Sequence, residues 1–202
     1  MQTLLNVRAS LFGAESASSR LADRFVTGWL AAHPGGQVIT RDLSPGRIPP
    51  LTAERFRAFG TPAAERTPLQ AADVALSDKL IAELEAADVV VIAAPMYNFS
   101  VPATLRDYFD HVARAGSTFR YTAAGPEGLL KGKKTYVFIT RGGRYSGAAD
   151  TQRPYLEQFL GFLGLDDIEF VLAEGLAQGD DARQRSLATA RASIDTLANI
   201  AA

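Results

Sequence analysis

The sequence predicts a doubly wound α/β fold, in which helices cover both faces of a parallel β-sheet. Strand-like and helix-like hydrophobic periods alternate along the whole chain, as they do where each strand is followed by a helical crossover. Residues 89–94 form an uninterrupted apolar run, Val-Val-Val-Ile-Ala-Ala, which is typical of a parallel strand buried on both faces. The length of 202 residues suits a single domain, residues 1–202.

Five segments have the composition of strands. They are residues 4–9, 37–43, 89–94, 135–140 and 168–172. Helices are predicted between them, where apolar residues recur at three- and four-residue spacing. These are residues 21–30, 67–88, 102–113, 156–163 and 187–197. A proline-containing loop is expected over residues 48–66, and residues 119–121 form an aromatic segment outside the predicted elements.

The start of the second helix has the clearest local signal. Thr67 can cap it, Pro68 suits the first helical turn, and Gln70 can complete a capping box. Right-handed crossovers then place helices on both faces of the sheet. Five such units, with the most apolar strand third, favour the flavodoxin-like strand order 2-1-3-4-5 over six-stranded dinucleotide-binding folds.

Composition narrows the classes of partner. The formal net charge of −1 leaves no basic surface for nucleic acid or anionic lipid. No apolar run reaches the roughly 18 residues of a membrane span, and the N-terminus has no signal-peptide layout, so we expect a cytoplasmic protein. The absence of cysteine excludes disulfides and thiol nucleophiles, so redox chemistry requires a bound cofactor.

Ligands of such sheets bind at the carboxyl ends of the strands, where three loops are informative. The loop after the first strand carries Ser10, Ser16 and Ser18 and leads directly into a helix, whose amides and dipole favour a phosphate monoester. The alternative is that these serines only cap the helix.

The loops after the third and fourth strands suit a flat ligand with polar edges. Met96, Tyr97 and Phe99 place a thioether and two aromatic rings around Asn98, although the rings could instead anchor the next helix. In residues 140–143, Thr-Arg-Gly-Gly, paired glycines let backbone amides approach a ligand closely. A phosphate site, a flat ring and amide donors together indicate flavin mononucleotide (FMN).

Competing motifs are missing or misplaced. No G-x-G-x-x-G follows the first strand, and the glycine- and lysine-rich residues 128–133 precede a strand, whereas a P-loop follows one. His33 and His111 lie on separate predicted helices, and we assign them no chemistry and the chain no metal site.

Beyond these features, the sequence resembles the FMN-dependent NADH:quinone oxidoreductase and azoreductase family over essentially its full length. The most specific stretch is Ala-Pro-Met-Tyr-Asn-Phe at residues 94–99, continued by motifs through residue 129. The resemblance implies hydride transfer from NADH or NADPH to FMN, and from there two-electron reduction of quinone or azo acceptors. It also implies a homodimer with two active sites at its interface.

The resemblance assigns FMN contacts in the same three loops. These are Ser10, Ser16, Ala17, Ser18, Met96, Tyr97, Asn98, Phe99, Thr140, Arg141, Gly142 and Gly143. It also suggests acceptor-binding residues, namely Phe119, Tyr121, Arg144 and Phe162, although Phe162 equally suits the core. Ala17, Thr140 and Arg144 depart from the family's usual residues, and Asn6 would place an amide in a buried strand. The flavin carries the chemistry, so no catalytic acid or base is named.

Two other functions fit the fold. A flavodoxin-type carrier would bind FMN and pass single electrons to proteins, but such carriers are typically very acidic and this chain is nearly neutral. A receiver module would need carboxylates at the end of the first strand, where Ala9 and Ser10 stand. The sequence leaves open the preferred nicotinamide nucleotide and the physiological acceptor.

Overall fold

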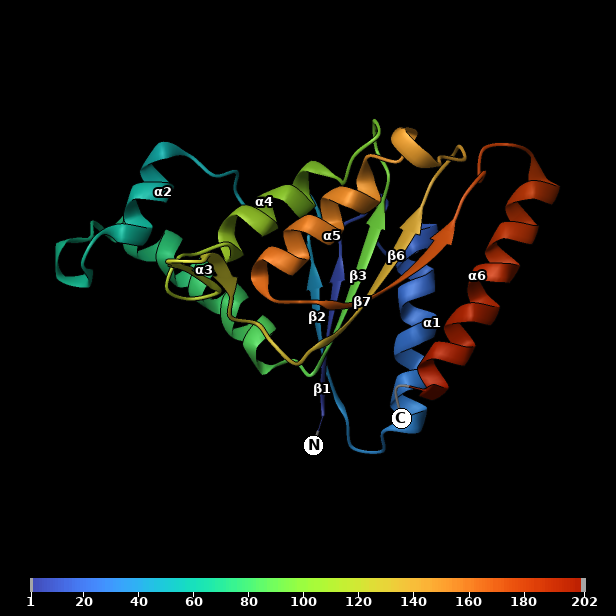
Figure 1. Ribbon diagram of the computed structural model, residues 1–202, viewed down its shortest axis with the longest axis horizontal. Helices are drawn as coiled ribbons and strands as arrows, with labels where there is room; N and C mark the ends of the chain where they lie inside the picture. The colour runs from blue at the N-terminus through green and yellow to red at the C-terminus, as the bar shows by residue number, and fades with distance from the viewer. Residues whose placement is uncertain (1, 201–202) are drawn as a thin grey trace.

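A five-stranded parallel sheet with strand order β2-β1-β3-β6-β7 forms the centre of the computed structural model, which describes residues 2–200 (Figure 1). Its strands are β1 Thr3–Arg8, β2 Gln37–Asp42, β3 Val89–Pro95, β6 Lys134–Thr140 and β7 Asp167–Ala173. In order of appearance this is 2-1-3-4-5, so the predicted flavodoxin-like topology is confirmed. The parallel register places Thr140 beside both Pro95 and Ala173, which brings three strand ends to one edge.

Helices cover both faces of the sheet. They are α1 Ala17–Ala32, α2 Ala53–Gly60, α3 Pro68–Ala86, α4 Ala103–Val112, α5 Gln152–Leu163 and α6 Asp180–Ile200, with short 3₁₀ turns at Gly13–Glu15, Ala63–Glu65 and Gly147–Ala149. Helices α1 and α6 lie side by side on one face, and α3, α4 and α5 lie on the other (Figure 1). Each layer closes its own core, one around Phe25 and Trp29 and the other around Tyr108 and Phe109.

The capping box predicted before the second helix is present. The Gln70 amide donates to Thr67 Oγ1 at 3.2 Å, and the Thr67 amide donates to Gln70 Oε1 at 3.0 Å. The helix ends at Ala86, two residues before the predicted end at Asp88, because Asp88 instead accepts a hydrogen bond from the Thr3 amide. Local signals thus placed the beginning of α3 better than its end.

Two elements differ from the sequence prediction. The expected loop contains α2, which Thr52 caps by accepting from the Arg55 amide at 3.2 Å. Of its residues only Ala58 is buried, so little of the helix packs against the core. The aromatic segment begins a separate antiparallel hairpin, β4 Phe119–Thr122 and β5 Gly125–Gly128, whose strands are too short to produce a period.

Several polar residues that the sequence analysis noted have buried or partly buried side chains in the structure. The side-chain amide of Asn6 is fully buried with no hydrogen-bond partner among residues 2–200, and such burial costs about 1–3 kcal/mol. His111 Nε2 lies 2.9 Å from the Pro49 carbonyl, and His33 Nδ1 lies 2.9 Å from the Trp29 carbonyl. Both histidines therefore have structural contacts. No helix within residues 2–200 has the length and apolar character to cross a membrane.

Candidate active site

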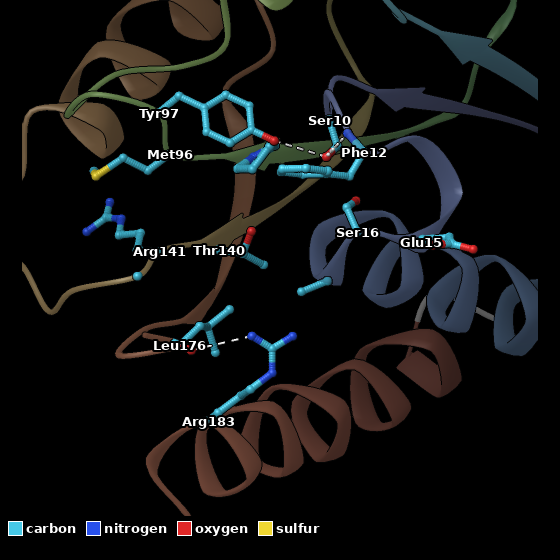
Figure 2. Close-up of a pocket in the computed structure, with 13 residues that line it drawn as sticks. Ser10, Phe12, Glu15, Ser16, Met96, Tyr97, Thr140, Arg141, Leu176 and Arg183 are labelled. Atoms are coloured by element: carbon cyan, nitrogen blue, oxygen red, sulfur yellow. Dashed lines mark hydrogen bonds between the residues drawn. The ribbon is translucent and has the colours of Figure 1, made fainter. Parts of the chain in front are cut away.

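A cavity of about 400 Å³ opens at the carboxyl edge of the sheet, within the roughly 300–1,000 Å³ usual for small-molecule sites. It lies between the loops after β1, β3, β6 and β7 and the first turns of α1 and α6 (Figure 2). Its lining residues are Ser10, Phe12, Glu15, Ser16, Ala17, Pro95, Met96, Tyr97, Thr140, Arg141, Gly142, Leu176 and Arg183. This is the edge at which doubly wound sheets bind their ligands.

A larger hollow, of about 700 Å³, lies at the opposite edge of the sheet. Its cations are already occupied: Lys134 pairs with Asp167, Lys131 pairs with Glu127, and Lys133 donates to the carbonyls of Glu85 and Ala87. We therefore place the candidate active site at the carboxyl edge, despite the smaller volume there.

Two serines of the first loop reach the cavity. Ser10 Oγ lies 3.1 Å from the Tyr97 hydroxyl and accepts from the Phe12 amide at 3.2 Å, which ties the loop after β1 to the loop after β3. Ser16 Oγ accepts from the Ser19 amide at 3.1 Å and so caps α1. Ser16 therefore caps the helix, as the alternative prediction for the serines has it, and its side chain also lines the cavity.

The neighbours of Ser16 divide between cavity and core. Ala17 lines the cavity, and its amide, at the first position of α1, has no carbonyl one helical turn before it within the helix. Ser18 is fully buried, outside the cavity lining, with its Oγ 3.3 Å from Ser16 Oγ. The start of α1 thus offers an anion a hydroxyl and unpaired backbone amides.

The loop after β3 closes in a two-residue turn. Tyr97 and Ser100 exchange two backbone hydrogen bonds, of 3.0 and 3.1 Å, around Asn98 and Phe99. Both central residues have positive φ, 50° and 65°, a conformation that costs a bulky residue about 1–2 kcal/mol. Met96 and Tyr97 line the cavity, whereas Asn98 and Phe99 are exposed beyond its lining. Phe99 packs edge-on against Tyr145.

The turn after β6 borders the cavity. The carbonyls of Arg141, Gly142 and Gly143 accept from the amides of Leu176, Ala177 and Gly175 at 2.9–3.0 Å. Because carbonyl and amide point in opposite directions across a trans peptide, the amides of Gly142 and Gly143 face away from the β7 loop. Neither amide has an acceptor among residues 2–200. Thr140 and Gly142 line the cavity, and Gly143 does not.

The side chain of Arg141 serves the architecture of this turn. It is fully buried, with Nη2 2.7 Å from Asp150 Oδ1 and Nη1 3.1 Å from Glu174 Oε1. Gln152, 3.4 Å from the guanidinium, donates to the carbonyl of Ala94 at 3.0 Å. This network joins the ends of β3, β6 and β7 to the start of α5.

The same network affects the titration of Asp150. Burial alone would raise the pKa of its carboxyl, but hydrogen bonds from Arg141 and from the amides of Arg153 and Gln152 outweigh that effect and hold the pKa below its usual value.

The predicted acceptor-binding residues lie away from the cavity of their own chain. Phe119 packs against Phe162, with 4.4 Å between ring centroids, and against Tyr121. The hairpin that carries Phe119 and Tyr121 packs at the C-terminal end of α5 (Figure 1). The cavity lies toward the other end of that helix, where Gln152 contacts Arg141 and the carbonyl of Pro95. Arg144 is exposed, packs against Gly175 and is outside the cavity lining.

Sequence reasoning missed several lining residues. Phe12 and Glu15 lie between Ser10 and Ser16 in the loop after β1, where only the serines carry a phosphate-binding signal. Leu176 and Arg183 follow β7, the fifth strand of the sheet, and so lie outside the three ligand loops that the sequence predicts. The topology itself was the available signal, since the carboxyl end of β7 lies next to that of β6.

Comparison with known proteins agrees with this arrangement. A protein-family model described as a flavodoxin-like fold matches residues 2–198, so the chain is of the flavodoxin-like class. The FMN-dependent NADH:quinone oxidoreductase of Cellvibrio japonicus is 48% identical over 96% of this chain and 98% of that protein. The FMN-dependent NADH:quinone oxidoreductase of Pectobacterium atrosepticum is 49% identical over 98% of this chain and 98% of that protein. The crystal structure of azoreductase from Bacillus anthracis superposes with a TM-score of 0.90 at 30% identity, covering 98% of this chain and 99% of the other.

The chain therefore belongs to the FMN-dependent NADH:quinone oxidoreductase family.

Proposed function

We propose that this protein is an FMN-dependent oxidoreductase that transfers two electrons from NADH to quinones and also reduces azo compounds. The observation that carries the proposal is the cavity at the carboxyl edge, where donors for an anion, an aromatic wall and free backbone amides converge. The names of relatives that match nearly the whole chain supply the cofactor, the donor and the quinone acceptor. The azo acceptor comes from the name of a structural relative.

The residues present fit FMN. Ser10, Ser16 and the first amides of α1 offer neutral donors to a phosphate monoester. Met96 and Tyr97 provide a wall for a flat ring, and the amides of Gly142 and Gly143 can bond ring carbonyls. We keep Ala17, Ser18, Asn98, Phe99, Thr140 and Arg141 as FMN-site residues. For Ser18 and Arg141 we expect positioning of the loop rather than side-chain contact.

When bound, FMN supplies the redox chemistry, accepting a hydride from NADH and passing it to the acceptor. The protein binds and orients the flavin and stabilises the charge on its ring. The amides of Gly142 and Gly143 would hold the ring and stabilise negative charge that it acquires, in the manner of an oxyanion hole. Donor and acceptor would occupy the cavity in turn, which gives ping-pong turnover.

We further propose a homodimer. Phe119, Tyr121 and Phe162 form an aromatic group remote from their own cavity, and Tyr121 is 76% exposed. Next to them, Tyr155, Phe159 and Phe162 line a groove along α5. A second copy seated on this aromatic surface would bring these rings to the partner's cavity, where they can line the acceptor pocket. The proposal also includes a cytoplasmic location, where NADH is supplied, and a single domain.

Purified full-length protein tests the proposed function directly. The absorbance spectrum and titration with FMN and FAD identify the flavin, and steady-state assays compare NADH with NADPH on quinone and azo acceptors. We expect one FMN per chain, weaker binding of FAD, and parallel double-reciprocal plots. Flavin binding without turnover of any small acceptor would favour the flavodoxin-type carrier instead.

A further inference from the structure

A side chain that sequence reasoning did not select, Arg183, reaches the cavity from α6 (Figure 2). Its guanidinium extends toward the start of α1, and its one side-chain hydrogen bond to the described part of the chain joins Nη1 to the Leu176 carbonyl at 3.4 Å. Within residues 2–200 it forms no salt bridge. Arg183 is therefore a cation with spare donors at the rim of the candidate site.

Helix packing fixes this placement. Helices α1 and α6 lie together and both begin at the carboxyl edge of the sheet (Figure 1). Their register is held by Arg24, which donates to both oxygens of Asp195 at 2.6 Å, and by Gly28, which faces Ala198 closely. Arg183 consequently stands beyond the first turn of α1, on the side of the cavity where Ser16 and Ala17 lie.

Among the cations that line the cavity, Arg183 is the one that can pair with an anionic ligand. Arg141 also lines it, but two carboxylates already neutralise that guanidinium. Glu15 lines the cavity as well, and Asp180 and Asp181 stand in the first turn of α6. An anionic ligand at the start of α1 would therefore have Arg183 as its charged partner and Glu15 as its repulsive neighbour.

We propose that Arg183 binds the phosphate monoester of FMN and makes the protein select FMN over riboflavin. The inference rests on the proposed function, because it places the phosphate at the start of α1. A guanidinium presents paired N–H donors that match phosphate oxygens, and its charge persists at every working pH. The remaining walls of the cavity, Met96, Tyr97 and Gly142, are uncharged and suit the ring.

Titration of flavin-free, full-length protein with FMN and with riboflavin tests the proposal, because the two ligands share the ring and differ in the phosphate. Arg183→Ala should weaken FMN binding about three- to thirtyfold, the range between an exposed ion pair and a charged hydrogen bond. Riboflavin binding should be unchanged. The loss of FMN affinity should shrink at high salt, which screens exposed charges.

Arg185→Ala is the matched control, since Arg185 is an exposed arginine on the same helix, outside the cavity lining. It should leave both affinities unchanged, and Arg183→Lys should retain part of the preference for FMN. Equal weakening of both flavins by Arg183→Ala, or no weakening of FMN, would overturn the proposal. The proposal would also be overturned if Arg183→Ala changed only the KM for NADH or NADPH, because Arg183 would then bind the nucleotide donor. If the parent protein bound neither flavin, the proposed function itself would fail.

Discussion

Arg141 Nη2 lies 2.7 Å from Asp150 Oδ1, in a contact where the arginine side chain is fully buried and the carboxylate is 13% exposed. Because the two residues stand at either end of the loop between β6 and α5, their contact fixes the loop that presents the Gly142 and Gly143 amides.

Arg141→Met should lower the free energy of unfolding by about 2–4 kcal/mol, because Asp150 and Glu174 would keep their charge without a partner in a largely dry site. Denaturant unfolding of the flavin-free protein measures the change. Arg153→Met is the control, since it breaks a half-exposed ion pair with Glu157 and should cost about 1 kcal/mol or less. Equal losses in the two variants would mean that burial of the Arg141 pair contributes nothing.

The contact also predicts a pH dependence. The pKa of Asp150 is lowered on folding, so its contribution to stability is present above the unfolded pKa of about 3.9 and is lost as pH falls through the lower folded value. Asp150→Asn should therefore destabilise the protein at pH 7 and have a smaller effect near pH 3. Urea unfolding of both proteins at the two pH values measures this. A difference in stability that stays constant with pH would contradict the assignment.

Ser16→Ala should have two separable effects. Loss of the cap on α1 should cost about 1 kcal/mol of stability, and loss of a phosphate donor should weaken FMN binding about fivefold. Thr52→Ala removes a cap of the same type from α2, away from the cavity, and should lower stability alone. Ser18→Ala should leave FMN affinity unchanged. If Ser16→Ala leaves FMN affinity unchanged, Ser16 only caps the helix and does not bind the phosphate.

Phe99 allows backbone strain to be separated from the role of its ring. Its φ is 65° and its side chain is 61% exposed. Phe99→Gly and Phe99→Ala both remove the ring, but only glycine accepts this φ freely, so the glycine variant should be more stable by about 1 kcal/mol. Both should lose acceptor turnover to a similar extent if the ring contacts the ligand. Thermal unfolding and steady-state assays measure the two effects, and an alanine variant as stable as glycine would argue against strain.

Tyr121 tests the proposed dimer. Its exposure means that Tyr121→Ala should change the stability of the isolated fold by less than about 0.5 kcal/mol. In a dimer that shares its sites, the same change should weaken association and lower acceptor turnover, as sedimentation and kinetics would show. Leu30→Ala alters an exposed apolar residue of α1, on the other face of the sheet, and should affect neither. A monomer with full activity would remove the shared-site proposal.

Most element positions could be predicted because their signals are local, whereas the sheet order followed from the number of strand–helix units and the place of the most apolar strand. Buried β3 is a continuous apolar run, and the Thr67 capping box needs only four consecutive residues. Helix α2 offers only the Thr52 cap as a local signal, because it is short and mostly exposed, and its ion pair between Arg55 and Asp73 joins it to α3.

The candidate site was predicted in part for the same reason. The loops after β1, β3 and β6 could be identified because each follows a predicted strand at the carboxyl edge. Arg183 could not, since its place in the cavity depends on how α6 packs against α1, and neither helix encodes that register alone. The buried contacts by which Arg141 joins the strand ends could not be predicted either, because Glu174 is far from Arg141 in the sequence.

The chemical make-up of the cavity lining has a consequence for the durability of the protein. Quinones are electrophiles that alkylate thiolates and free amines, and they can inactivate the proteins that handle them. The chain contains no cysteine, and its lysines, Lys79, Lys131, Lys133 and Lys134, are absent from the cavity lining. The cations beside the cavity are arginines, whose guanidinium remains protonated and is a poor nucleophile. A reactive acceptor held there would meet a thioether, a carboxylate, aromatic rings, hydroxyls and guanidinium groups, and neither a thiol nor a lysine amine.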